Sequence, residues 1–324
     1  MQLISYRWAV LLSIAVNVQL TLPLSRFVAI NRNNHHSLEN YYLRAHLGDR
    51  SYSFLSTPLE FSLFKTEKDA CSRFGNWSSA KDTWKRYLSP QNWILCHKDY
   101  GSDGNCFYHA TAGLLRDTDM KGEAFSFPKT LPAGILTSVE NLPKNNSYFT
   151  HEELRVLAAI YFIGVNPHDQ DAVSHFDKDK FKEKLEFVRD MQAVERYPDL
   201  KWQPEERLKE LESGRDPLDI AKMVYNDISS SRPVKTWASH SDMIALSHIL
   251  NIAFFIIPSN SQRVQLVKHD DSLPKFTLSL YYTNMLHFEG AGFARTTDSR
   301  LFSVIQGYDI PSVFSQLLPK TNNS

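Results

Sequence analysis

Cysteine is scarce in this chain of 324 residues, which contains only Cys71, Cys96 and Cys106. No two of them are spaced as Cys-x-x-Cys, which argues against a cysteine-rich zinc site. Three cysteines are too few for a disulfide framework and are odd in number. They therefore favour a reducing working compartment and leave room for a free, reactive thiol. We expect no metal and no cofactor.

An excess of charge of either sign is also missing. Lys plus Arg and Asp plus Glu each total 36, so the formal net charge is zero, and no basic stripe stands out. Because nucleic acid attracts proteins through clustered Lys and Arg, it is not an expected partner. Hydrophobic residues make up 42% of the chain, which is enough for a packed core and for one large domain with an extension.

A hydrophobic run of full membrane-spanning length is missing too. Residues 8–22 form an apolar stretch that Asn17 and Gln19 interrupt, and Pro23 ends it. This is short for a membrane span, which needs about 20 apolar residues. The segment has the outline of a signal peptide without a clean small-x-small cleavage site. A signal peptide, a membrane anchor and a buried element of an extension all stay open, and membrane association stays open with them.

Periodic patterns predict an α/β or α+β domain. Thr150 and Glu153 stand three residues apart before an apolar stripe, which predicts a capped helix. The apolar residues 252–258 predict a compact strand, and residues 263–270 with 275–283 predict a hairpin. Strands flanked by helices indicate a small central sheet with helices around it.

Composition divides the chain into parts. Residues 1–90 have weak periodicity and indicate an N-terminal extension. We expect the main domain over 91–297 and a C-terminal tail over 298–324. Inside the domain, residues 166–230 are highly charged and helical in pattern, which predicts a helical insertion. The charged side chains of this insertion form either a solvated face or a binding surface for a partner.

Cys106 follows the polar turn Ser-Asp-Gly-Asn and precedes a predicted helix. Free amides and the dipole at a helix N-terminus stabilise negative charge, so we expect this position to lower the pKa of the thiol. The same turn exposes backbone N–H groups that can bind an oxyanion. From these residues alone, Cys106 is either a nucleophile or a small buried core residue.

A nucleophilic thiol needs a base, and the base needs an orienting group. His287 can be the base. Glu289, two residues on, can point the same way along an extended segment that leads into a Gly-containing loop. Cys96 with His97, and Cys106 with His109, are rival pairs. Adjacent side chains diverge, and His109 would lie one turn into the helix, so both pairs are poorer arrangements.

The stretch around Cys106, SDGNCFYHA, resembles the Asp-Gly-Asn-Cys-aromatic motif of the ovarian-tumour (OTU) family of cysteine proteases. Two further blocks occur in the family's order. WASHSDMIALSHILNIAFFII is similar to its Trp-containing helix and following strand, and LSLYYTNMLHFEG is similar to its strand leading to His-aromatic-polar. ELRVLAAIYF fits the helix between the cysteine and histidine blocks. The resemblance covers roughly residues 95 to 295.

The resemblance implies roles for individual residues. Cys106 would be the nucleophile and His287 the general base. Glu289 would orient His287, at a position where relatives have Asp or Asn. Asp103 would shape the cysteine loop, with its backbone N–H and that of Cys106 forming the oxyanion hole.

The resemblance also implies a papain-type fold and a deubiquitinase, which hydrolyses the isopeptide bond after the ubiquitin C-terminus through a thioester. Ubiquitin or polyubiquitin is then the partner, and the cytosol is the site of action, in another cell if the chain is an exported effector. The helical insertion resembles the extra lobe of some bacterial effector members. Two alternatives stay open: an inactive ubiquitin-binding module, and a cysteine peptidase acting on another ubiquitin-like modifier.

Trp237 and Asn251 match structural positions of the family, which implies packing roles for both. Phe288 stands where Tyr is usual, and Ala238 replaces the common Gly.

Overall fold

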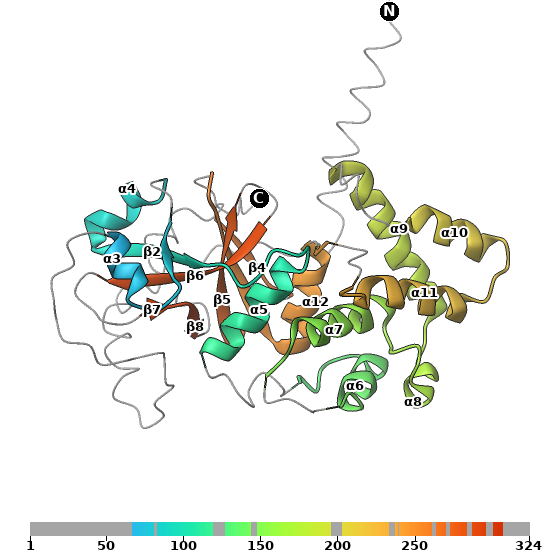
Figure 1. Ribbon diagram of the computed structural model, residues 1–324. Helices are drawn as coiled ribbons and strands as arrows, with labels where there is room; N and C mark the ends of the chain where they lie inside the picture. The colour runs from blue at the N-terminus through green and yellow to red at the C-terminus, as the bar shows by residue number, and fades with distance from the viewer. Residues whose placement is uncertain are drawn as a thin grey trace, which may run out of the picture.

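The computed structural model describes residues 67–80, 83–118, 127–143, 148–195, 203–232, 237–238, 240–260, 264–269, 273–283, 287–295 and 301–306. Within these residues the chain is a mixed α/β domain, with a central sheet and helices around it, as the sequence predicts (Figure 1). The apolar segment 8–22 lies outside them. In the described part of the chain, no helix combines the length and the apolar character that crossing a bilayer requires.

The sheet has the main strand order β1-β2-β6-β5-β3-β4. These strands are β1 (Ser78–Ser79), β2 (Trp93–Lys98), β3 (Ile252–Pro258), β4 (Gln265–Val267), β5 (Phe276–Thr283) and β6 (His287–Arg295). Two short strands complete the described sheet: β7 (Leu301–Phe302) pairs with β6, and β8 (Val304–Gln306) pairs with β5. Only β3 and β5 are parallel; the other described pairs are antiparallel.

The expected hairpin of residues 263–270 with 275–283 is wrong. β4 pairs antiparallel with β3, and β5 pairs parallel with the other edge of β3. Phe255 of β3, for example, has Leu266 as its neighbour in β4 and Ser279 in β5. All seven residues of β3 are buried, as expected for a strand with a neighbour on each side. Local alternation locates strands, but pairing depends on contacts distant in sequence.

Helices cover both faces of the sheet because the strands are apolar on both. In β2, Ile94 and Cys96 join a large core with the helices on one face, whereas Trp93 and Leu95 join a smaller core with Trp84 on the other. The helices of this part are α3 (Glu67–Ser72), α4 (Lys85–Leu88), η2 (Ser89–Gln91), α5 (Cys106–Asp117), α6 (Ala133–Glu140), α7 (His151–Ile163) and α12 (His240–Leu250). The predicted capping box of Thr150 and Glu153 is confirmed at the start of α7.

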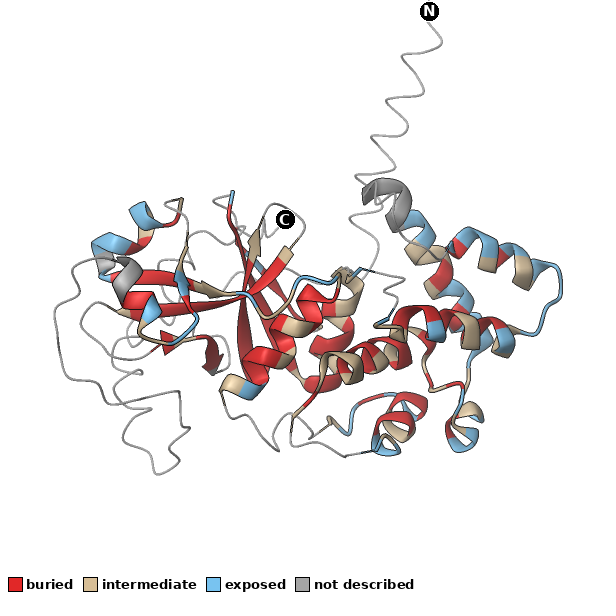
Figure 2. Ribbon diagram, in the orientation of Figure 1, coloured by how far each residue is buried: buried red, intermediate tan, exposed pale blue. Residues whose placement is uncertain are grey.

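The described residues of the segment 166–230 are mostly helical, as the sequence predicts. They form α8 (Gln170–Val173), α9 (Lys178–Glu195), α10 (Pro204–Glu212) and α11 (Pro217–Ser229). α11 packs against α7, while α9 and α10 project away from the sheet with exposed outer faces (Figure 2). Phe181 and Leu185 are fully buried on the inner face of α9. Most charged side chains of α9 and α10 are exposed, which fits a solvated face and a surface for a partner equally.

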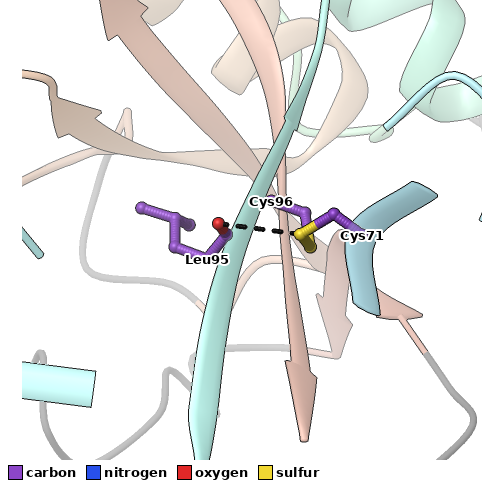
Figure 3. The surroundings of a disulfide bond; sticks show 3 residues. All are labelled: Cys71, Leu95 and Cys96. Atoms are coloured by element: carbon purple, nitrogen blue, oxygen red, sulfur yellow. Dashed lines mark hydrogen bonds between the residues drawn. A yellow bond between two sulfur atoms is a disulfide. The ribbon is translucent and has the colours of Figure 1, made fainter. Parts of the chain in front are cut away.

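Segments outside the expected main domain also join the sheet. α3 and β1 lie within residues 1–90 and pack on β2, and residues 301–306 supply β7 and β8. A disulfide links Cys71 of α3 to Cys96 of β2, with the two Cα atoms 5.6 Å apart (Figure 3). The scarcity of cysteines did not predict this bond. The two cysteines meet because α3 lies against β2, which their spacing in sequence does not show.

Candidate functional site

Cys106 is the first residue of α5, as the sequence predicts, and follows a tight turn. Gly104 in that turn has φ of +84°, a left-handed conformation that favours glycine. Asn105 occupies the N-cap position, but its side chain makes no capping hydrogen bond to α5. Cys106 itself is only 8% exposed. The start of the helix therefore presents a buried thiol to the sheet.

Tyr100 anchors the loop between β2 and α5. Its hydroxyl donates to Asp117 Oδ2 at the end of α5, over 2.8 Å, and Lys98 Nζ donates to the same oxygen. The ring lies against two glycines: a Cβ added at Gly113 would be 2.2 Å from Tyr100 Cδ1, and one at Gly290 would be 2.7 Å from Cε2. Because neither glycine has a side chain, the Tyr100 ring fits between α5 and β6.

His287 is the first residue of β6, next to Thr283 of β5. The predicted Gly-containing loop after His287 is wrong, because those residues continue β6 and pair with β2. Phe288 packs edge-to-face on Phe107, with ring centroids 5.7 Å apart, and its backbone hydrogen-bonds the sulfur of Cys106. The dipeptides Cys106-Phe107 and His287-Phe288 are therefore in direct contact.

Two carboxylates face the ring of His287. Its Nε2 lies 3.2 Å from Asp99 Oδ1 and 3.9 Å from Glu289 Oε1. Glu289 is nearly buried, and its other oxygen, Oε2, contacts His97 Nδ1. Thr283 Oγ1 also donates to Glu289 Oε1 over 3.4 Å. Glu289 is thus placed between two histidines, and Asp99 is the closer acid to His287.

Sequence reasoning missed Asp99 and used His97 only in a rival pair with Cys96. Asp99 comes directly after β2, and its Oδ1 also accepts the N–H of Gly101 over 2.8 Å. Its position at the end of a strand could have indicated a site residue, because side chains at strand ends gather at one edge of a sheet. For His97, nothing in the sequence shows that β2 pairs with β6 and brings it to Glu289.

Asp103 lies in the cysteine turn and organises it. Its Oδ1 accepts both the backbone N–H and the side-chain N–H of Asn105, each over 3.1 Å, and lies 3.0 Å from His109 Nε2. Although burial acts to raise it, these hydrogen bonds hold the pKa of Asp103 below its ordinary value. His109, from the second rival pair, is therefore engaged with Asp103.

The expected lowering of the Cys106 pKa is wrong. Burial raises the pKa of this thiol. Backbone hydrogen bonds from Phe288, Phe107 and Cys106 act in the opposite direction, as expected at a helix start, but they do not offset burial. Asp99 adds a further small increase. Burial accordingly favours the thiol form of Cys106 over the thiolate.

Two other family-matched positions have different outcomes. Trp237 is 52% exposed, so the implied packing role is wrong for it. Asn251 has φ of +51° in the turn between α12 and β3, a conformation that Asn tolerates better than most residues. Its carbonyl accepts the N–H of Lys275 over 2.8 Å. The described residues include no cluster of three or more His, Cys, Asp or Glu side chains suited to hold a metal ion.

Among known proteins, the chain matches solved structures only. No protein-family model matches the chain, and no curated protein matches it. Solved structures similar to it include one described as "Structure of Ovarian Tumor (OTU) domain in complex with Ubiquitin". The match has 10% sequence identity and a TM-score of 0.32, and it covers 75% of this chain and 91% of the other.

Proposed function

We propose that this chain is a thiol-dependent deubiquitinase, with Cys106 as nucleophile and His287 as general base. One observation supports the chemistry above all: Phe288, the neighbour of His287, contacts both the sulfur of Cys106 and the ring of Phe107. A buried thiol, an imidazole and carboxylates thus come from three separate segments of the chain to one edge of the sheet. The choice of ubiquitin as substrate rests on the three ordered sequence blocks that resemble the OTU family.

In the proposed reaction, Cys106 transfers its proton to His287 and attacks the carbonyl carbon of the bond after the ubiquitin C-terminus. The resulting oxyanion accepts hydrogen bonds from backbone amides of the cysteine turn, including those of Asp103 and Cys106. The C–N bond then breaks, and His287 returns the proton to the leaving lysine amine. Water hydrolyses the thioester with His287 as base, which regenerates the thiol.

The carboxylates give His287 its orientation. Because Asp99 and Glu289 both face Nε2, the other nitrogen, Nδ1, is the one that is directed away from them and remains for the thiol. The carboxylates also stabilise the imidazolium that forms when His287 accepts the proton. Since burial raises the pKa of Cys106, this transfer belongs to the reaction and not to the resting state.

The test is covalent labelling by ubiquitin with an electrophilic C-terminus. We expect the wild-type protein to gain the mass of one ubiquitin, and both Cys106→Ala and His287→Ala to fold without being labelled. Cleavage of each diubiquitin linkage type then gives the substrate preference. Labelling that persists in Cys106→Ala would contradict the assignment of the nucleophile.

A second candidate is an inactive ubiquitin-binding module, and the raised pKa of the buried Cys106 favours it. This module would bind ubiquitin without labelling or turnover. A panel of electrophilic probes made from other ubiquitin-like modifiers separates both candidates from a peptidase with a different substrate: labelling by one of those probes alone would assign that modifier.

A further inference from the structure

Arg155 of α7 is a fully buried cation close to the cysteine turn. Its Nε donates to Asn105 Oδ1 over 2.5 Å, and its Nη2 donates to the carbonyl of Gly104 over 3.4 Å. Its Nη1 donates to the carbonyl of Ile228 in α11 over 3.0 Å, and its guanidinium lies 4.6 Å from the centre of the Tyr108 ring. One side chain thus joins α7, α11 and the residues before Cys106.

A buried charge is expensive unless hydrogen bonds replace its water. Arg155 donates hydrogen bonds to three neutral acceptors, and two of them belong to Gly104 and Asn105. An apolar residue would fill the same space in α7 more simply. The position of the guanidinium therefore suggests a role in fixing the turn.

Both ends of the Asn105 side-chain amide make hydrogen bonds to groups outside α5. Oδ1 accepts from Arg155, while Nδ2 donates to Asp103 Oδ1 over 3.1 Å and to the carbonyl of Ser231 over 3.3 Å. Asn is among the best N-cap residues, yet here its side chain makes no capping bond to α5. The amides of the first turn, including that of Phe107, are thereby kept from an Asn105 cap, and the Phe107 amide instead bonds the sulfur of Cys106.

We propose that Arg155 is a positioning residue of the candidate active site, because it holds the Gly104 carbonyl and the Asn105 amide so that the peptide units before Cys106 direct their N–H groups to the reacting atoms. This rests on the proposed role of Cys106 as the nucleophile. Arg155 also donates to the carbonyl of Ile228, and Asn105 donates to the carbonyl of Ser231. These two hydrogen bonds connect the end of α11 to the cysteine turn.

The test uses the reactivity of Cys106 itself. Since Cys71 and Cys96 form a disulfide, Cys106 is the free thiol, and intact-mass measurement of carbamidomethylation by iodoacetamide reports on it alone. The variants are Arg155→Met and Arg155→Lys. Lysine keeps the charge but lacks the fork that reaches both acceptors, so it separates positioning from charge. We expect alkylation at pH 7 to slow about tenfold in both, with the pH profile displaced to higher pH.

Arg207→Met is the matched control. The Arg207 side chain is 15% exposed and pairs with Glu210 in α10 and Asp227 in α11, and these ion pairs involve no residue of the cysteine turn. Its alkylation profile should match that of the wild type. Arg155 variants that unfold cooperatively in urea, yet show the wild-type profile, would overturn the inference. Loss of a cooperative transition in both Arg155 variants would also overturn it, since the residue would then be required for folding itself.

Failure of the proposed function gives a different pattern. Alkylation of Cys106 needs no ubiquitin. If alkylation is slower in the Arg155 variants but ubiquitin does not label the wild type, ubiquitin is wrong as the substrate and the positioning role of Arg155 still holds. With turnover of a fluorogenic ubiquitin amide, we expect kcat to fall about tenfold or more while KM changes little, because the turn amides act on the oxyanion and not on bound ubiquitin.

Discussion

Asp99 Oδ1 lies 3.2 Å from His287 Nε2, whereas Glu289 Oε1 lies 3.9 Å from the same atom. The side chain of Asp99 is 56% exposed and that of Glu289 is 11% exposed, so the closer acid is also the more solvated one. Glu289 is further engaged by His97. A charge acts more strongly where water is excluded, so the two carboxylates are expected to share the orientation of His287.

Replacing both carboxylates should cost more than the two single changes together. In Asp99→Asn or Glu289→Gln, the other acid still faces Nε2, and we expect kcat/KM to fall about tenfold in each case. In the double variant no carboxylate orients the ring, and we expect a loss of about a thousandfold. The measurement is turnover of a fluorogenic ubiquitin amide. A double variant no slower than the product of the single effects would show that the acids act independently.

The features of the fold and of the site that depend on one short stretch were predictable from sequence. Cys106 at a helix start, the capping box of Thr150 and the Gly104 turn all follow from local preferences of the chain. The roles of Cys106 and His287 stay predictions until their chemistry is measured. The site's second histidine was not predictable, because His97 meets Glu289 only through the pairing of β2 with β6.

Tertiary contacts also explain the remaining differences. β3 was recognised as a strand, but its parallel pairing with β5 follows from long-range packing that no local pattern encodes. The thiol of Cys106 was expected to be acidified by the helix start, and burial against β6 outweighs that effect. A buried Arg155 could not be anticipated, since Arg is usually exposed unless it is paired.

Gly113→Ala should destabilise the protein although alanine favours helices. In an open helix this change stabilises by up to about 1 kcal/mol. Here the new Cβ would lie 2.2 Å from Tyr100 Cδ1, and overpacking of this kind costs about 1–3 kcal/mol. Urea unfolding measures the net loss. In a Tyr100→Ala background the clash is absent, so the same change should be neutral or stabilising; an equal loss in both backgrounds would refute the account of the Tyr100 anchor.

The Cys71–Cys96 disulfide should be formed in the isolated, non-reduced protein and should stabilise it. The two residues are 25 apart in sequence, and closing a loop of this length contributes about 3.5 kcal/mol. We expect a reductant to lower the midpoint of urea unfolding. The Cys71→Ser, Cys96→Ser double variant should start from the lower midpoint and show no response to reductant. Alkylation of all three cysteines in the native, non-reduced chain would contradict the bond.

His151 should make the protein sensitive to acid. Burial, and next the neighbouring His109, whose ring centroid is 4.0 Å away, lower the pKa of His151 below 6.5. Glu152 and Asp103 act in the opposite direction, and Arg232 adds to the lowering. The unfolded chain therefore binds a proton near pH 6.5 that the folded chain does not. It follows that stability is complete above about pH 6.5 and falls as the pH drops from there toward the lowered pKa. Urea midpoints at about pH 7.5 and about pH 5.5 measure this loss.

The matched variants for this prediction are His151→Gln and His175→Gln, which remove a partly buried and an exposed imidazole respectively. Glutamine does not titrate, so His151→Gln should lose less stability between the two pH values than the wild type does. The partly buried His240, whose pKa burial also lowers, accounts for sensitivity that persists in that variant. His175→Gln should retain the full acid sensitivity. If His151→Gln and His175→Gln lost equal stability on acidification, the ring of His151 would not be the group that excludes the proton in the folded chain.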